Sequence, residues 1–432
     1  MGGCVMNGLD KYIDKIRNIA VKIQKNDVLM SISSGLQACL PVIIIGAFSS
    51  LLANFPIDAW KTYVAETGIK SFLALPNQMT TNIISVYAVF LIAYKLAKKK
   101  GHDGIQVGIV SLMSFLVLNG YVVLEKTSAL TFEYLGAAGL FTAMFVAVVV
   151  NFIFSLFKKY NLYMKLPDEV PDQVGKVFSS LIQAIACAIL FGFLSFGIAQ
   201  TSYGTLSQMM YTLLQEPLQG IAGSFGGMLV FIFISQVLWF FGIHGTQVTG
   251  AVWKPIYLAM DMANLAAFNA GTPMTELPYI VGWAFWGVFV TLGGTGATAG
   301  LNILMAFKSK SKQMKTIGKL TLPTTLLNIN EPLVFGTPLV LNAFTVIPFI
   351  FVPMINAIIG YVLTAVNILP RMIGITPVLG VPVIVRGLLE GSVAFGIASA
   401  AFIVLDGILY YPFFKAMDNN AFREEEKKEQ EQ

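Results

Sequence analysis

The sequence predicts an all-α polytopic membrane protein with about ten transmembrane helices, re-entrant hairpins and a two-part transporter organisation. Of the 432 residues, 56% are hydrophobic and 12% are charged, whereas about 25% of the residues of a soluble domain are charged. The hydrophobic residues gather in runs of about 18 to 25, which is the length of a helix that crosses a bilayer. The pattern shows no short alternating strands, which disfavours a transmembrane barrel.

The net charge of +5 indicates membrane topology and not nucleic-acid binding, because the basic residues are concentrated in a few short loops. Residues 7–26 carry apolar side chains at helical spacing opposite several lysines, which predicts an amphipathic helix on an anionic membrane surface. This places the N-terminal region, residues 1–26, in the cytoplasm. The three cysteines and two histidines are scattered, so we expect no metal site and no cofactor.

Candidate spans follow this helix along the whole chain. They cover residues 28–53, 80–97, 105–123, 134–157, 177–199, 221–243, 251–268, 278–307, 339–366 and 391–415. The positive-inside rule predicts that the lysine-rich loops at 95–100, 158–165 and 308–319 are cytoplasmic. This sidedness requires the weakly apolar segment 251–268 to cross the membrane, and it places both termini in the cytoplasm.

A hydrophilic connector lies between the fourth and fifth spans, and the chain is predicted to divide into two groups of five spans. The predicted regions are a scaffold and dimerisation region at 27–160 and 177–200, the connector at 161–176, a substrate-binding region at 201–417 and a charged cytoplasmic tail at 418–432. The second group holds most of the interrupted helices and intramembrane polar residues, where a midplane binding site is expected in a transporter. It also holds two proline-rich stretches, 320–338 and 370–390, which are predicted to form re-entrant hairpins or extended loops within protein.

The sequence LTLPTTLLNINEPLVFGTPLVLN, which begins at Leu320, contains the strongest candidate site. Its single carboxylate, Glu331, follows Asn328 and Asn330. An ionisable group at bilayer depth is costly unless it lines a cavity or has a partner, so Glu331 is a functional-site candidate. The alternative is a surface loop between two spans.

His244 lies between two glycines in WFFGIHGTQVTG, at the end of the sixth span. Glycine lets the backbone unwind and approach a ligand, and histidine can give or take a proton near neutral pH. We expect His244, Thr246 and Gln247 to contact a substrate; alternatively, His244 binds a backbone carbonyl at the membrane interface. Trp239 and Trp253 are either interfacial anchors or faces for a sugar ring.

Other polar and small residues have less defined roles. The glycines of LGGTGATAGLN, residues 292–302, are predicted to allow close helix contact, with substrate contact as the alternative. Asn77 is a candidate substrate contact from the scaffold region. Asp261 lies in a weak span without an assigned role, and Glu276 is expected in an outer loop.

Two motifs together resemble a known family. FGIHG, residues 241–245, and NxNEPxxFGxPxxLN, residues 328–342, resemble the membrane component EIIC of the bacterial phosphoenolpyruvate:sugar phosphotransferase system, in its lactose/cellobiose/diacetylchitobiose family. The resemblance implies a homodimer in the cytoplasmic membrane that contacts its partner copy through the first half and binds a β-linked disaccharide in the second half. A separate EIIB protein would transfer a phosphoryl group from a phosphocysteine to the sixth-carbon hydroxyl of the sugar.

On this resemblance, Glu331 and His244 hydrogen-bond that hydroxyl, one of them acts as the base, and Asn330 holds neighbouring hydroxyls. The chain departs from the family where many members carry a tryptophan in the last hairpin, because it reads TPVLGVPVIVRGLLEGS with Arg386 and Glu390 instead. Arg386 is therefore a further candidate for substrate contact, and the sugar stays open. The alternative function is an ion-coupled secondary sugar transporter with Glu331 and His244 as a proton relay. An intramembrane enzyme is disfavoured, because the sequence shows no metal cluster and no nucleophile–base pair.

Overall fold

The computed structural model describes most of the chain. The described residues are 22, 25–53, 58–124, 127–130, 132–162, 164, 178–337, 339–342, 344–375 and 380–430. Nearly all of the expected amphipathic helix at 7–26, and most of the connector at 161–176, lie outside these residues. The chain divides into two compact units. We call Ile23–Ala222 with Lys254–Asn269 the N-terminal unit, and Gly223–Trp253 with Ala270–Gln432 the C-terminal unit.

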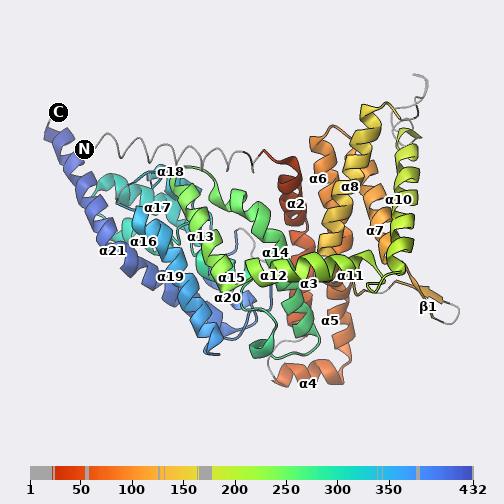
Figure 1. Cartoon of the computed structure of the whole chain (residues 1–432). Helices are drawn as coiled ribbons and strands as arrows, with labels where there is room; N and C mark the ends of the chain where they lie inside the picture. Colours follow the sequence, from red (N-terminus) through yellow and green to blue (C-terminus); the bar gives the residue numbers. More distant parts are fainter. Residues whose placement is uncertain are drawn as a thin grey trace. The chain divides into compact units, whose positions relative to one another are not determined.

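The N-terminal unit is a bundle of helices with one small hairpin (Figure 1). Its elements are α2 (Asp27–Ala38), α3 (Leu40–Ala53), α4 (Asp58–Glu66), α5 (Ile69–Gln78), η1 (Thr81–Ile83), α6 (Ile84–Lys99), α7 (Gly104–Asn119), β1 (Val122–Leu124), β2 (Thr127–Ala129), η2 (Ala137–Gly139), α8 (Leu140–Lys159), α10 (Leu181–Ala199), α11 (Leu206–Met210), η3 (Tyr211–Gln215) and α12 (Glu216–Ala222). Helix α6 packs against α2, α7 and α8. The core-facing side chains of α6 are fully buried; they are Ile84, Ala88, Ile92 and Leu96. They lie on one face of the helix because they are spaced four residues apart.

The hairpin corrects the all-α expectation. Strands β1 and β2 pair antiparallel, with Val122 opposite Ala129. The β-branched Val122, Val123 and Thr127 favour extended backbone at this place, but each strand has only three residues. A strand this short leaves no clear alternating pattern in the sequence.

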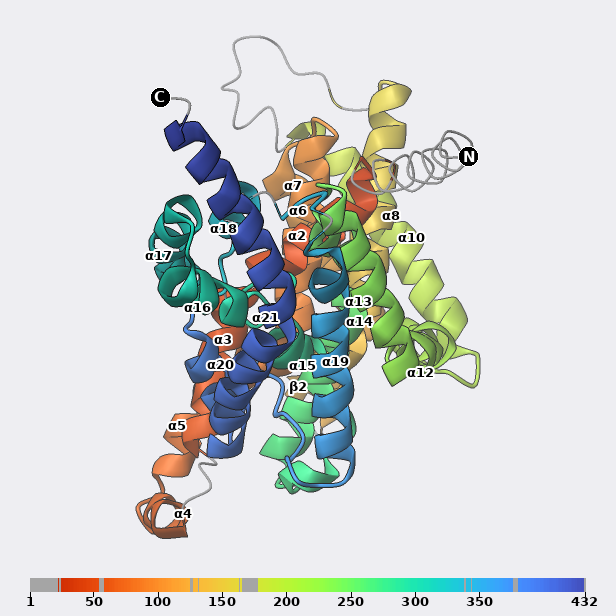
Figure 2. The same ribbon diagram turned by 90° about the vertical axis from the view of Figure 1, so that its left-hand side faces the viewer.

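The C-terminal unit contains the remaining helices, many of them short (Figure 2). Its elements are α13 (Phe225–Phe240), the first part of α14 (Gly245–Asn269), η4 (Met274–Glu276), α15 (Trp283–Phe285), the π-helical η5 (Trp286–Val290), α16 (Ala299–Lys308), α17 (Lys312–Leu326), α18 (Glu331–Gly336), α19 (Val346–Ala365), α20 (Val383–Leu389) and α21 (Val393–Gln430). Buried aromatic rings fill the core. The ring of Trp253 stacks on Trp286 at 4.4 Å between centroids and meets the edge of Trp283 at 5.9 Å. Trp253 is therefore a packing residue and not an interfacial anchor.

The expected span 278–307 is not one continuous helix. The backbone leaves helical geometry after η5 and turns through Gly293, Gly294 and Gly296, all at positive φ, before α16 begins at Ala299. Glycine reaches this left-handed region without a steric cost, so three of the glycines make a turn. Gly300 behaves as predicted, because its backbone lies directly against Gly407 of α21 and a Cβ at Gly300 would overlap Gly407.

The described helices include fewer full-length spans than the ten predicted. Five are long and apolar enough to cross a membrane, or up to seven if each of two bent helix pairs is one span. The helices at two expected spans, α7 and α13, have 16 residues each, and such a helix is about 24 Å long. Ten crossings stay a prediction for the chain in a bilayer.

Helix α21 continues without a break into the region predicted as a charged tail (Figure 2). Two of its carboxylates bind the turn between α16 and α17. Asp418 accepts hydrogen bonds from the Ser309 hydroxyl and from the backbone N–H groups of Lys310 and Ser311. Glu425 accepts from the Ser311 hydroxyl at 2.7 Å and from two further N–H groups at the start of α17. These bonds attach the end of α21 to the first turn of α17, where carboxylates also complement the helix dipole.

Candidate functional site

His244 lies in the turn that separates α13 from α14. Helix α13 ends at Phe240, Gly242 has a φ of 74°, and α14 begins at Gly245. The Nδ1 atom of His244 accepts the backbone N–H of Gln247 at 3.2 Å. A neutral imidazole whose Nδ1 accepts a hydrogen bond carries its proton on Nε2. In this arrangement Nε2 is a hydrogen-bond donor.

Trp239 fixes the position of this turn. Its ring lies 4.3 Å from the ring of His244, and its Nε1 donates to the hydroxyl of Thr246 at 3.1 Å. Trp239 is buried, with 3% of its surface exposed, which is inconsistent with an interfacial anchor. Thr246, predicted to contact a substrate, is used here to hold the indole.

Glu331 is the first residue of the short helix α18, which follows the end of α17 at Leu326. Asn328 makes the turn between the two helices with a φ of 62°, and Pro332 suits the first turn of α18 because its missing N–H would have no helical partner there. The Glu331 side chain is exposed. Within the described part of the chain, no hydrogen bond or ion pair holds its carboxylate. The carboxylate is thus available to a ligand.

Two contacts bring the His244 turn to α18. Phe335 follows Glu331 by one helical turn, and its ring lies 6.4 Å from that of Trp239. After α18, the N–H of Leu341 donates to the carbonyl of Phe240 at 3.0 Å. These contacts join α18, which begins at Glu331, to the turn that carries His244, although the two segments are far apart in sequence.

Asn330, the residue before Glu331, clamps α18 to the glycine turn. Its Oδ1 accepts the N–H of Thr295 at 3.2 Å, and its Nδ2 donates to the Thr295 carbonyl and the Thr298 hydroxyl, each at 2.7 Å. The side chain is 3% exposed. A Cβ on Gly294 would overlap the Asn330 amide. The close approach therefore needs a glycine at that position.

Asn328 makes a second clamp. Its Oδ1 accepts the N–H of Gly293 at 2.9 Å, and its Nδ2 donates to the carbonyl of Val381 at 3.1 Å. Asn328 and Asn330 were predicted as substrate contacts. In this structure the amide groups of both bind backbone or hydroxyl groups of the protein, so they position Glu331.

Gln236 completes this network, and sequence reasoning missed it. It comes from α13 and is fully buried. Its Oε1 accepts the Thr295 hydroxyl at 2.9 Å and the N–H of Gly296 at 3.1 Å. The signal was present in the sequence, because Gln236 is one of only two polar side chains in the apolar run of α13. A buried amide in such a run needs partners from elsewhere in the fold.

The other predicted contacts have structural partners. Arg386 is 6% exposed and its Nη1 donates to the carbonyl of Gly287 at 3.1 Å. Glu390 accepts the N–H groups of Gly374 and Ile375. Asn77 lies in the N-terminal unit, where its Nδ2 donates to the carbonyl of Gly46 and the hydroxyl of Thr81, while its Oδ1 accepts from Asn269. The predicted roles of Arg386 and Asn77 as sugar ligands stay predictions, and Glu390 had no predicted role.

The candidate site thus consists of one exposed carboxylate on α18, one imidazole in the turn between α13 and α14, and a network of neutral amides that holds the residues beside the carboxylate. Among the described residues, no group of three or more His, Cys, Asp or Glu side chains is placed to hold a metal ion. The site can bind a hydroxyl group between a donor and an acceptor, and the carboxylate can take that hydroxyl's proton.

The chain is similar to one family model and to several known proteins. Residues 33–353 match the family model described as phosphotransferase system, EIIC. The chain is 35% identical to the lichenan permease IIC component of Bacillus subtilis over 97% of this chain and 96% of that protein. It is 29% identical to the cellobiose-specific EIIC component of Geobacillus stearothermophilus over 97% of both chains. The crystal structure of the transporter ChbC, the IIC component of the N,N'-diacetylchitobiose-specific phosphotransferase system, aligns with a TM-score of 0.90 at 29% identity, covering 97% of this chain and 99% of that chain.

Proposed function

This chain belongs to the EIIC family of the phosphotransferase system and is a sugar permease component, and from this premise we propose how its site handles the sugar. Glu331 and His244 bind the sixth-carbon hydroxyl of a β-linked disaccharide of the cellobiose type. A partner EIIB protein supplies the phosphoryl group from a phosphocysteine. The relatives named for lichenan, cellobiose and N,N'-diacetylchitobiose support this substrate class.

The observation that carries the proposal is the exposed carboxylate of Glu331 at the start of a helix that contacts the turn with His244. Because Nδ1 of His244 accepts a backbone N–H, the proton of the neutral imidazole lies on Nε2, and in the sugar complex this N–H donates to the sugar oxygen. Glu331 is then the acceptor and takes the hydroxyl proton as the oxygen forms a bond to phosphorus. The S–P bond of the phosphocysteine breaks, and its electron pair leaves with the cysteine sulfur. Phosphoryl transfer needs mainly such positioning and charge stabilisation.

The finer architecture belongs to the same proposal. The N-terminal unit forms the contact between two copies in the membrane, and the C-terminal unit carries the sugar. Two re-entrant segments, 320–338 and 370–390, reach into the bilayer. Both termini face the cytoplasm of a bacterial cell, because the positive-inside rule places the lysine-rich loops on that side.

Transport in sealed vesicles tests the proposal. Uptake of a cellobiose-type sugar should require EIIB and its phosphoryl donor, and it should persist when the proton gradient is collapsed. Glu331→Gln should lose sugar phosphorylation by about 100-fold or more, as is typical for removal of a general base. Glu276→Gln is the matched control, since Glu276 is an exposed carboxylate of the same unit. Uptake that continues without the donor and stops with the proton gradient would instead support a proton relay.

A further inference from the structure

A polar cavity lies in the N-terminal unit, at the lysine-rich ends of α6 and α8. It has a volume of about 440 Å³ and is lined by residues of four helices and of the turn between α6 and α7. The lining residues are Lys98, Gly101, His102, Asp103, Gln106, Phe154, Lys158, Ser179, Ser180 and Gln183. The candidate sugar site in the C-terminal unit shares none of them. The cavity has therefore no assigned role.

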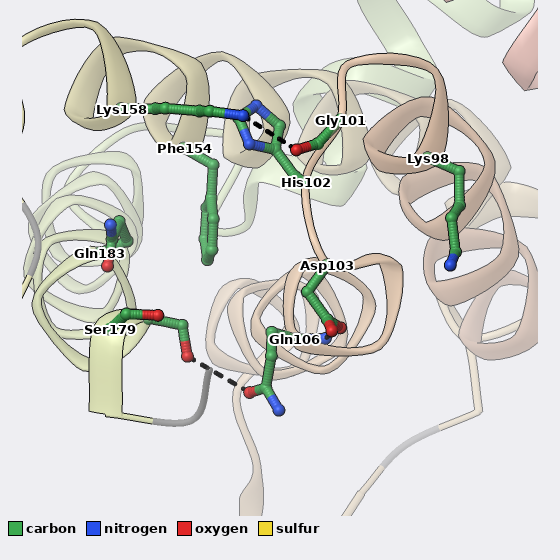
Figure 3. Close-up of a pocket in the computed structure, with 10 residues that line it drawn as sticks. Lys98, Gly101, His102, Asp103, Gln106, Phe154, Lys158, Ser179 and Gln183 are labelled. Carbon is green, nitrogen blue, oxygen red and sulfur yellow. Dashed lines mark hydrogen bonds between the residues drawn. The ribbon is translucent and has the colours of Figure 1, made fainter. Parts of the chain in front are cut away.

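Figure 3 shows how the side chains surround this space. Ser179 and Gln183 stand on one side, Asp103 and Gln106 come from the helix opposite, and Phe154 extends between them. The wall is thus a ring of hydrogen-bonding groups around one apolar face. Such a mixture suits a polar group that carries a short hydrocarbon part.

The cations of the cavity are held by neutral partners. Lys158 uses one of its three N–H donors on the carbonyl of Gly101 at 2.9 Å, and the ammonium of Lys98 stands 5.7 Å from the ring of Tyr94. The carboxylate in the lining, Asp103, caps α7 by accepting two backbone N–H groups. Within the described part of the chain no ion pair joins it to either lysine. Two ammonium groups thus face the cavity without neutralisation by direct contact.

The far wall contains a buried amide that lacks a partner. Gln183 is 5% exposed, and its Oε1 makes no hydrogen bond within the described part of the chain. Leaving such a group unsatisfied costs about 1–3 kcal/mol. Oε1 is fully enclosed, but the Nε2 end of the same amide is not, and it makes no hydrogen bond within the described residues, so it can donate to a ligand hydroxyl in the cavity. The lysines favour an anion, and the Nε2 donor favours a hydroxyl oxygen next to it.

We propose that this cavity binds a phosphate ester that carries free hydroxyl groups, with the phosphate at Lys98 and Lys158 and a hydroxyl at Gln183. Two sources provide this chemistry, the glycerol headgroup of phosphatidylglycerol and a soluble polyol phosphate such as glycerol 3-phosphate. The positive-inside rule predicts that these helix ends lie at the cytoplasmic headgroup level, where anionic lipids attract lysines. His102 borders the same space and hydrogen-bonds Ser155 at 2.9 Å.

Ligand binding to the purified full-length chain tests the proposal. The lipid arm measures the affinity for phosphatidylglycerol and phosphatidylmethanol in phosphatidylcholine nanodiscs, and the soluble arm measures glycerol 3-phosphate in neutral detergent. The variant Lys98→Gln/Lys158→Gln should weaken binding at least about tenfold, since a hydrogen bond to a charged group contributes about one decade of affinity or more. The matched control is Lys99→Gln/Lys159→Gln, which removes equal charge at neighbouring exposed positions outside the lining.

Gln183→Leu tests the hydroxyl separately from the charge. The unmodified chain should prefer phosphatidylglycerol to phosphatidylmethanol, which has the same charge but no hydroxyl, and Gln183→Leu should remove that preference. Binding in either arm with this dependence on Lys98, Lys158 and Gln183 supports the proposal and identifies the source. The proposal is overturned by equal loss in both lysine pairs or by no binding in either arm. It is also overturned if the lipids bind without preference for the hydroxylated one and glycerol 3-phosphate does not bind.

Discussion

Asn330 offers the sharpest test of how the candidate site is built. Its amide makes three hydrogen bonds to the glycine turn. A net contribution of about 0.5–1.5 kcal/mol for each bond gives a destabilisation of roughly 1.5–4.5 kcal/mol for Asn330→Ala, and side-chain bonds in membrane proteins tend toward the lower end. The loss would also free Glu331, the next residue, from its fixed position. We therefore expect both stability and sugar affinity to fall.

Thermal unfolding and sugar binding, measured on the same purified protein, separate this reasoning from its rival. A direct sugar ligand would lose affinity on truncation while the unfolding temperature changed little. Gln313→Ala is the control, since Gln313 is exposed on α17 and a surface substitution changes stability by about 0.5 kcal/mol or less. The positioning role is refuted if Asn330→Ala unfolds at the temperature of that control and still loses its sugar.

Three further predictions follow from the same structure. Gly294→Ala should lower sugar binding and the unfolding temperature together, because the new methyl group overlaps the clamp amide and Gly294 has a φ of 95°; unchanged binding would contradict the clamp. Asp418→Ala should cost about 1–3 kcal/mol by leaving buried N–H groups unpaired, whereas the exposed Glu424→Ala on the same helix should cost little in the same unfolding assay. Burial, and after it the charge of Lys158, lowers the pKa of His102 from its ordinary value of 6.5. Below pH 6.5 the unfolded chain therefore binds more protons than the folded chain. The free energy of unfolding should fall as the pH drops from 6.5 through the lowered pKa of the folded state. His102→Gln should flatten this fall in unfolding measurements from about pH 7.5 to 5.5, and an unchanged slope would refute the assignment.

The features that sequence reasoning predicted well depend on local chemistry. Glycines on both sides of His244 indicate a helix break, and α13 indeed ends before them. The membership of the EIIC family is likewise confirmed, because the motif around Glu331 is long enough to be specific. Each of these signals is contained within a few neighbouring residues.

The features that were missed depend on partners far away in the sequence. The Asn330 amide binds residues 32 and 35 positions earlier, and no local pattern states which backbone groups will meet it. The glycines at 293–296 are consistent with a packed helix or with a turn, and only the approach of Asn330 selects the turn. The apolar run at 278–307 was predicted as one span because its mean hydropathy is that of a membrane helix. Hydropathy carries no information on the backbone dihedral angles, so it did not reveal the turn at the glycines.

The absence of charge in the network explains why one glutamate can dominate the site. Gln236, Asn328 and Asn330 hold the glycine turn with neutral amides. Asn328 and Asn330 both donate and accept, so each satisfies two backbone groups without a counter-ion, and Gln236 accepts two hydrogen bonds through Oε1. A charged clamp at this depth would cost several kcal/mol in desolvation and would pair with or repel the carboxylate. Because the clamps are neutral, they fix the backbone of Glu331 and leave its charge for the ligand. The same reasoning predicts the roles: the buried amides position the site, and the exposed carboxylate of Glu331 acts in it.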